Sequence, residues 1–226
     1  MKKSFSFLFA LASLVYLTSC GSNGDNNGSS DAGSASSENS NGKYPIKSGI
    51  VKTKMSAPMM GGDIYDELYF DAWGAQEKHK SVASISMLGQ NIETVSYTMM
   101  KDGWIYSWTE GQNTGSKMKP QDMDEMADMN FDKMSKEMMD DLGIKKIGTE
   151  TIKGKSCDKY EMHKDGMGDG TFWVWKNIPM RSEMSMGGVS MTSEVESIQE
   201  NVNHASGTFD LPADVIFSEM GGTDQM

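Results

Sequence analysis

The stretch RSEMSMGGVSMTSEVE, residues 181–196, decides the fold class. From Val189 to Glu196 apolar side chains alternate with serine, threonine and glutamate, so one side of the segment is apolar and the other is polar. Alternation with a period of two is typical of a half-buried strand. The pair Gly187 and Gly188 separates two such runs, which predicts a β-hairpin.

Alternating segments of the same kind lie on both sides of this hairpin. They cover residues 50–55, 64–72, 78–87, 92–99, 144–153, 155–162 and 171–178, and a last segment ends in FDLP at 209–212. Closely spaced strands joined by short turns predict an antiparallel sheet, and a sheet with many strands twists and curls. We therefore expect a mainly β (α+β) domain, a strongly curved antiparallel half-barrel of about 10–11 strands.

Residues 120–142, PQDMDEMADMNFDKMSKEMMDDL, break the alternation. Apolar side chains recur there at steps of three and four, which places them on one stripe of a helix; they are Met123, Ala127, Phe131, Met134, Met138 and Leu142. Pro120 suits the first turn, and Gly143 can end the helix. Because a curled sheet leaves an apolar concave face, we expect this one amphipathic helix to cover it.

The N-terminus has the features of an export signal. Lys2 and Lys3 precede a short apolar run that ends in LTSC at Cys20. These four residues resemble the lipobox of bacterial lipoproteins, and the resemblance implies a signal peptide over 1–19 and lipid attachment to Cys20. We expect a lipid-anchored protein of the bacterial cell envelope, at the outer membrane. The alternative is an ordinary signal peptide whose cysteine is incidental.

The segment after the cysteine predicts a tether. Residues 20–43 are rich in glycine, serine and asparagine and hold no aliphatic side chain larger than alanine, so we expect them to be disordered. Residues 44–226 then form a single domain of ordinary size.

Charge and cysteine content exclude several classes of protein. The formal net charge is −11, and loss of the two lysines of the signal would lower it to −13. An acidic chain is a poor ligand for nucleic acid or for the surface of an anionic membrane. The only cysteines are Cys20 and Cys157. With Cys20 lipidated no internal disulfide forms, and we expect Cys157 to be a buried free thiol.

Three segments carry a resemblance to a known family. GTETIKGKSCDKYE at 148–161, FWVWKNIPMRSEM at 172–184 and FDLPADV at 209–215 resemble a bacterial lipoprotein domain of unassigned function. That domain is related to the carriers and receptors that sort lipoproteins to the outer membrane. The resemblance implies an incomplete, curved β-barrel with helical cover and a cavity for acyl chains, and it implies an apolar ligand or a lipoprotein as partner.

Aromatic side chains are the first candidates for lining such a cavity. Two strands place them on one side, and the predicted helix adds apolar residues; together they are Trp104, Tyr106, Trp108, Trp173, Trp175, Phe131, Met134 and Met138. Apolar pockets at the mouth of a curved sheet are common binding sites. The alternative is that these residues fill the core.

Methionine is unusually frequent, with 22 in the chain. Thioethers are soft ligands for Cu(I), and Met123, Met126 and Met129 are spaced to lie near one another on a helix. The sequence therefore allows a Cu(I) or Ag(I) binder as a second hypothesis. The alternative is that methionine is a flexible filler of irregular apolar space.

No catalytic motif is present in the sequence. It lacks a GxSxG elbow, an HExxH pair and a phosphate-binding loop. We therefore expect a non-enzymatic, membrane-anchored lipoprotein without a cofactor that binds a hydrophobic or amphipathic ligand in a curved-sheet cavity. The two alternatives are a methionine-rich Cu(I)/Ag(I)-binding lipoprotein and a structural interaction module with a filled core.

Overall fold

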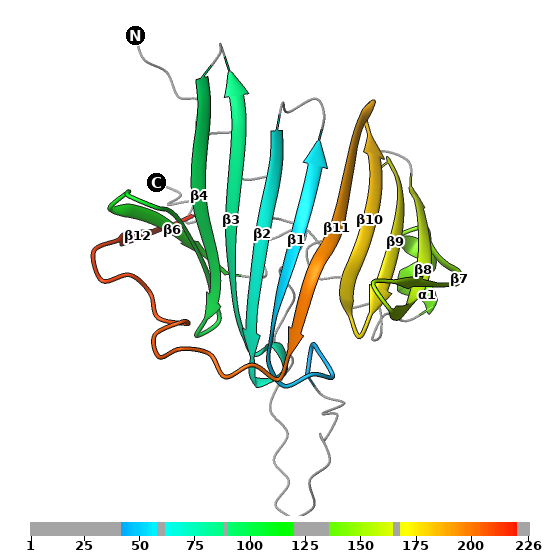
Figure 1. The fold of residues 1–226 in the computed structure, drawn as a ribbon, viewed down its shortest axis with the longest axis horizontal. Helices are drawn as coiled ribbons and strands as arrows, with labels where there is room; N and C mark the ends of the chain where they lie inside the picture. Colours follow the sequence, from blue (N-terminus) through cyan, green and yellow to red (C-terminus); the bar gives the residue numbers. More distant parts are fainter. Residues whose placement is uncertain (1–41, 58–61, 88–89, 120–135, 165–167, 221–226) are drawn as a thin grey trace, which may run out of the picture.

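The computed structural model describes residues 42–57, 62–87, 90–119, 136–164 and 168–220. In these residues one sheet dominates (Figure 1). Its strands are β1 (Gly49–Ala57), β2 (Gly62–Asp71), β3 (Gln76–Met87), β4 (Gln90–Lys101), β5 (Trp104–Thr109), β6 (Thr114–Met118), β7 (Ile144–Ile152), β8 (Lys155–Lys164), β9 (Gly168–Trp175), β10 (Ile178–Met186), β11 (Val189–Glu200) and β12 (Ile216–Glu219). The described helices are the single turn η2 (Ala72–Gly74) and α1 (Lys136–Asp141).

The twelve strands form one sheet in the order β12-β6-β5-β4-β3-β2-β1-β11-β10-β9-β8-β7. All neighbours are antiparallel except β12, which runs parallel to β6. Within the described ranges the two end strands, β12 and β7, do not pair with each other, so the sheet is not closed. The prediction of a mainly β, curled antiparallel sheet is confirmed, with twelve strands in place of about 10–11.

The half of the sheet that ends in β7 is strongly curled. The register places Glu194 of β11 in one row with Arg181, Trp173 and Lys159 of the next three strands. Lys153, in the turn between β7 and β8, lies several residues beyond that row, roughly 20 Å from Glu194 if the sheet were flat. Its Nζ is nevertheless 3.5 Å from the Glu194 carboxylate. The sheet therefore rolls back on itself here.

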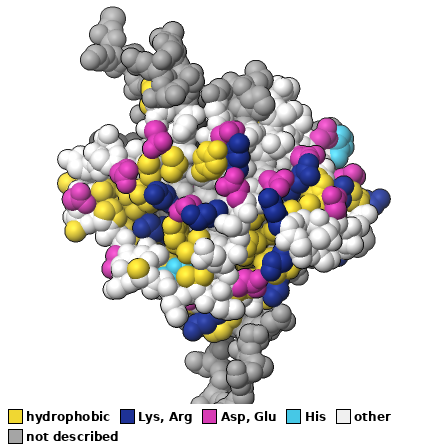
Figure 2. Space-filling view, in the orientation of Figure 1, with side chains coloured by type: hydrophobic (Ala, Val, Ile, Leu, Met, Phe, Trp, Pro, Cys, Tyr) yellow, Lys and Arg dark blue, Asp and Glu magenta, His cyan; other side chains and the backbone are white. Residues whose placement is uncertain are grey.

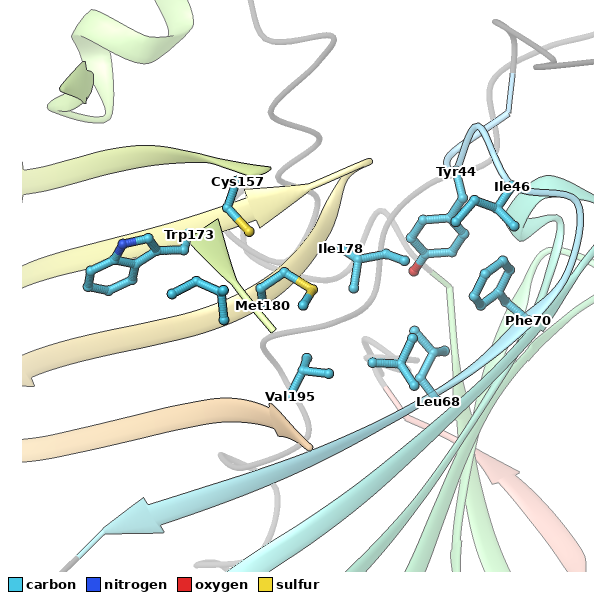
Figure 3. Packing of buried hydrophobic residues seen from close by; sticks show 11 residues of the cluster. Tyr44, Ile46, Leu68, Phe70, Cys157, Trp173, Ile178, Met180 and Val195 are labelled. Atoms are coloured by element: carbon cyan, nitrogen blue, oxygen red, sulfur yellow. The ribbon is translucent and has the colours of Figure 1, made fainter. Parts of the chain in front are cut away.

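The main buried cluster draws on both halves of the sheet. Figure 3 shows its side chains pointing toward one another between β8–β10 on one side and β1 and β2 on the other. Its members are Tyr44, Ile46, Val51, Leu68, Phe70, Ile152, Cys157, Trp173, Ile178, Met180 and Val195. Tyr44 and Phe70 are in ring contact, with 4.4 Å between centroids. The segment before β1 thus supplies part of the core.

A second buried cluster lies on the other face of β8 and β9. It contains Leu142, Ile144, Tyr160, Met162, Phe172 and Val174. On β8 and β9 these positions have the opposite parity to Cys157 and Trp173, so the two clusters lie on opposite faces of these strands. Met139 of α1 packs against this second cluster.

The predicted long helix over the concave face is not supported. The described helix spans only Lys136–Asp141 and packs beside the end strand β7. It contacts the second cluster, not the cluster that holds Trp173. Residues 120–135 of the predicted helix lie outside the described part of the chain. None of the described helices is long and apolar enough to cross a membrane.

The predicted strand that ends in FDLP is wrong. Turn hydrogen bonds occupy this segment, from the Asp210 amide to the Gly207 carbonyl (3.0 Å) and from the Val215 amide to the Pro212 carbonyl. The connection from β11 to β12 instead runs past the ends of the central strands to the far edge (Figure 1). Lys78 and Lys101 donate to its carbonyl oxygens at Thr208 and Phe209, at 3.2 Å and 3.1 Å.

Gly143 ends α1, as its position in the sequence predicts. Its φ is +66°, its amide donates to the Asp140 carbonyl, and its own carbonyl accepts from the His163 amide. A Cβ at this position would overlap the His163 carbonyl oxygen. Gly103 has a similar φ of +73° with nothing within 4 Å of the added Cβ, so it is a matched control.

We expect Gly143→Ala to destabilise the fold clearly more than Gly103→Ala. The control carries only the cost of the left-handed backbone, about 1–2 kcal/mol, whereas Gly143→Ala must also displace β8 from its contact with the helix end. Urea denaturation of both variants measures the difference. Equal losses of stability would show that the contact between Gly143 and His163 is loose.

Candidate functional site

The described surface contains a trough in the curled half of the sheet. Its volume is about 520 Å³. Twelve residues line it, and they form three consecutive cross-strand rows over β8, β9, β10 and β11. The rows are Glu161, Thr171, Glu183 and Thr192; Met162, Gly170, Met184 and Met191; and His163, Asp169, Ser185 and Ser190. The trough is therefore a piece of curved sheet three rows deep and four strands wide.

The middle row is the apolar part of the trough. Met162 is buried and belongs to the second cluster, and Met184 packs against that cluster. Gly170 contributes no side chain between them. A Cβ on Gly170 would lie 3.0 Å from the Phe172 ring and 3.5 Å from the terminal methyl of Met162. The Phe172 ring and the end of the Met162 side chain therefore lie over the glycine, and a larger residue at position 170 would have to displace them.

The ionisable groups of the outer rows are partly paired with one another. The His163 ring contacts the Asp169 carboxylate, and both side chains are exposed to solvent. Glu183 forms an ion pair with Arg181, which lies just outside the trough. Among the twelve lining residues there is no lysine or arginine. The margin of the trough is polar and on balance acidic.

The aromatic candidates of β5 pack against the far end of the sheet. Trp108 stacks on Tyr97, with 5.1 Å between ring centroids, and it also contacts an edge-on Phe217 of β12. Tyr106 meets the edge of Phe217 as well. Trp104 lies under the Lys117 ammonium, 4.3 Å from its ring centroid. These rings are in contact with other side chains at one end of the sheet.

The aromatic candidates of β9 are enclosed by charged side chains. Trp173 is buried, and its indole N–H donates to Glu150 at 2.8 Å, which lowers the pKa of that carboxyl. The Arg181 guanidinium lies 4.9 Å from the Trp173 ring centroid. Lys155 lies 4.2 Å from the ring of Trp175. Cation–π contacts of this kind stabilise a ring at a partly polar position.

The structure does not bring the two aromatic sets together. Strands β5 and β9 are seven positions apart in the sheet. The row that begins at Trp108 and Tyr97 continues through the charged residues Lys80, Glu67 and Lys52. Figure 2 shows charged side chains of both signs spread among hydrophobic ones over the face in view. None of the five aromatic candidates is among the lining residues of the trough.

The other predicted site residues are not placed. Cys20, Phe131, Met134 and the trio Met123, Met126 and Met129 lie outside the described residues, as do the signal over 1–19 and the tether to residue 41. Met138 belongs to α1, but its side chain is not described. In the described ranges no three histidine, cysteine, aspartate or glutamate side chains gather as a metal site.

A buried polar cluster on β2 and β3 was not predicted. Asp66 accepts hydrogen bonds from the Ser81 hydroxyl (2.6 Å) and shares a 2.9 Å contact with His79 Nδ1. Both Asp66 and His79 are buried. The signal was available in the sequence, because Asp66 has the parity of the apolar residues Leu68 and Phe70. A polar residue at an inward position of a strand needs a partner.

Glu77 and Lys43 form a second buried polar contact. The Lys43 ammonium lies 2.7 Å from the Glu77 carboxylate, and the two side chains are 8% and 1% exposed. Lys43 is the last residue of the segment assigned to the tether, and its side chain is part of the folded core. The Lys43 carbonyl also accepts a hydrogen bond from Asn177.

Cys157 is a buried free cysteine, as predicted. Burial raises the pKa of its thiol, and its Sγ lies 3.4 Å from the Lys155 carbonyl oxygen. A protonated thiol is a poor nucleophile. We expect iodoacetamide at pH 8 to label Cys157 at least about 100-fold more slowly in the native chain than in urea, because exposing a core thiol costs several kcal/mol. Similar rates in both states would place the thiol at the surface.

Comparisons with known proteins show similarity at the level of fold. No family model matches the sequence, and neither does any curated protein. An uncharacterized conserved protein from Thermus thermophilus is similar with a TM-score of 0.52 and 8% sequence identity, over 77% of this chain and 91% of that chain.

The similar solved structures also include a lipoprotein-sorting domain and LprF. A putative outer membrane lipoprotein-sorting protein domain from Vibrio parahaemolyticus has a TM-score of 0.33 and 8% identity, over 73% of this chain and 89% of that chain. LprF from Mycobacterium bovis has a TM-score of 0.35 and 10% identity, over 70% and 88% of the two chains. A lipoprotein-sorting domain, which is the kind of protein that the sequence resembles, is thus among the similar structures.

Proposed function

We propose that this protein is a non-enzymatic lipoprotein of the cell envelope, anchored through Cys20, that binds a hydrophobic or amphipathic ligand in the trough of β8–β11. The observation that carries the proposal is the row of Met162, Gly170, Met184 and Met191 along the middle of that trough. Pockets for small ligands have volumes of roughly 300–1,000 Å³, and the trough, at about 520 Å³, is of this size.

The side chains of the trough suit an adaptable apolar contact. Methionine has three rotatable bonds and a polarisable sulfur, so it can repack around ligands of different shape. Side chains of the neighbouring rows point to the opposite face of the sheet, so the methionine row offers an apolar contact. A hydrophobic molecule, or the apolar part of an amphipathic one, would therefore lie along this row.

The proposal also states that the protein binds its ligand without converting it chemically. The histidine at the trough, His163, is 81% exposed in its side chain and contacts an exposed carboxylate, that of Asp169. A general base is most effective when a protected site tunes its pKa and aligns it with the substrate. The solvated pair of His163 and Asp169 fits a margin that is wetted by water.

Two variants of β11 test the proposal. Met191 lines the trough and Ser197 does not. We expect Met191→Trp in the full chain to weaken binding of a fluorescent medium-chain fatty acid at least about tenfold, since an indole in the methionine row would occupy the space of the ligand. Ser197→Trp should bind like the unchanged protein. The trough is not the site if both variants bind the probe equally well.

A further inference from the structure

We propose that the methionine row of the trough is also a site for a soft monovalent metal ion, Cu(I) or Ag(I), held by the thioether sulfurs of Met162, Met184 and Met191. Met184 and Met191 belong to one hairpin and Met162 lies about twenty residues before them, and all three differ from the trio Met123, Met126 and Met129 that the helical spacing indicated. The inference does not depend on the binding of an apolar ligand.

The strand register brings the three methionines to one place. Met184 of β10 is directly opposite Met191 of β11, and Gly170 of β9 separates Met184 from Met162 of β8. Residues directly opposite on neighbouring strands have Cβ atoms about 4.5–5.5 Å apart and share a face. The side chains of Met184 and Met191 therefore start close enough for their sulfurs to share one ion.

Gly170 allows the third thioether to reach the other two. Met162 is two strands away from Met184, and Gly170 lies between them in the row, with the Phe172 ring 3.0 Å from the position of a Cβ on this glycine. The terminal methyl of Met162 already lies 3.5 Å from the position of a Cβ on Gly170. The end of this side chain is thus directed over the glycine, toward the strand that carries Met184.

The chemistry of these groups selects a soft cation. A thioether is neutral and has no proton to lose, so it binds Cu(I) well and has little affinity for hard ions such as Mg²⁺ or Ca²⁺. The three sulfurs are the ligands that this face offers, because the carboxylates of Glu161, Glu183 and Asp169 belong to the neighbouring rows, whose side chains point to the opposite face of the sheet.

The test is titration of the full chain, purified in detergent, with Ag(I) as a redox-inert probe. All variants carry Cys157→Ala, because the thiol would also bind silver. The key variant is Met162→Leu with Met184→Leu and Met191→Leu, which keeps apolar side chains of similar volume. The matched control replaces Met123, Met126 and Met129 with leucine. Native mass spectrometry and calorimetry give stoichiometry and affinity.

The proposal predicts one tightly bound Ag(I) per chain in the parent and in the control. The trough variant should bind silver at least about tenfold more weakly. Loss of a residue that only supports a metal ligand already lowers metal affinity about 10- to 100-fold, and this variant loses the ligands themselves. If the trough variant does not fold, Met184→Leu with Met191→Leu, both at partly buried positions, tests the same claim. Unchanged affinity in the trough variant, or loss of silver in the control, would overturn it.

The same variants separate this inference from the proposed function. Leucine keeps the row apolar, so the trough variant should still bind the fluorescent fatty acid while it loses silver. Met191→Trp fills the row and also removes one of the three sulfurs, so it is not used to test the metal site. Retained silver together with lost fatty-acid binding in the leucine variant would contradict the assignment of the sulfurs.

Discussion

Phe70→Ala should be among the most destabilising single substitutions in this protein. The Phe70 side chain is fully buried, its ring contacts Tyr44, and a Cβ on Gly49 would lie 2.6 Å from the ring. Removing a buried phenylalanine leaves a cavity that neighbours fill only in part, which costs about 3–5 kcal/mol. A fall of that size in the free energy of unfolding, measured with urea, is the expected result.

The control for Phe70 is an aromatic residue on the same strand. Tyr65 of β2 is 41% exposed, so Tyr65→Ala should change the stability by about 0.5 kcal/mol or less. Because Tyr44 belongs to the segment before β1, Phe70→Ala should also loosen that segment. Protease cleavage near residue 42 should become faster in Phe70→Ala and not in Tyr65→Ala. Equal stability of the two variants would contradict the packing described for Phe70.

Glu77→Gln should have the second large effect. The substitution leaves the Lys43 ammonium buried against a neutral amide, and breaking a buried ion pair by removing one charge costs roughly 3–5 kcal/mol. The two side chains are 8% and 1% exposed, so water cannot replace the lost partner without local unfolding. The expected result is a lower urea midpoint with an unchanged slope.

A double variant distinguishes the pair from its single charges. Lys43→Met with Glu77→Leu removes both charges and should be more stable than Glu77→Gln alone, because no uncompensated charge stays buried. Asp63→Asn is the exposed control. Asp63 pairs with Lys54 at 2.7 Å, but both side chains are well exposed, and the urea midpoint should not move. A double variant less stable than the single one would show that the pair itself is strongly favourable.

The hairpins of this fold could be predicted from the sequence because their signals are local. In residues 181–196 the alternation and the Gly-Gly turn specify β10 and β11 directly. The edge strand β12 has no such signal. It is four residues long, exposes Ile216, and pairs in parallel with β6, about a hundred residues earlier in the chain. Parallel pairing of distant segments leaves no pattern in either segment alone.

The inward polar residues were missed for a different reason. The alternation of β2 and β3 is read as one apolar face, yet Asp66 and His79 occupy that face. The strand register stabilises them there, because it places Asp66 in contact with both His79 and Ser81. A sequence pattern shows the parity of a residue but not its cross-strand partner.

The trough could not be predicted because four strands build it together. Its methionines come from three strands, and Gly170 lies inside β9, just before the segment 171–178 that the alternation predicts. The aromatic residues were the more conspicuous candidates, but a side chain that forms cation–π and ring contacts is already satisfied by the fold. The site depends on a glycine, Gly170, in the middle of the methionine row, and the periodicity of apolar residues does not reveal the role of a glycine.

The most direct test of the central claim is native mass spectrometry of the lipidated full chain, released from the bacterial envelope in mild detergent. Collisional activation should release an apolar or amphipathic small molecule from the unchanged protein and from Ser197→Trp, and little or none from Met191→Trp. The account would be contradicted if Met191→Trp carried the same molecule in the same amount, or if the unchanged protein carried none and did not bind the fatty-acid probe.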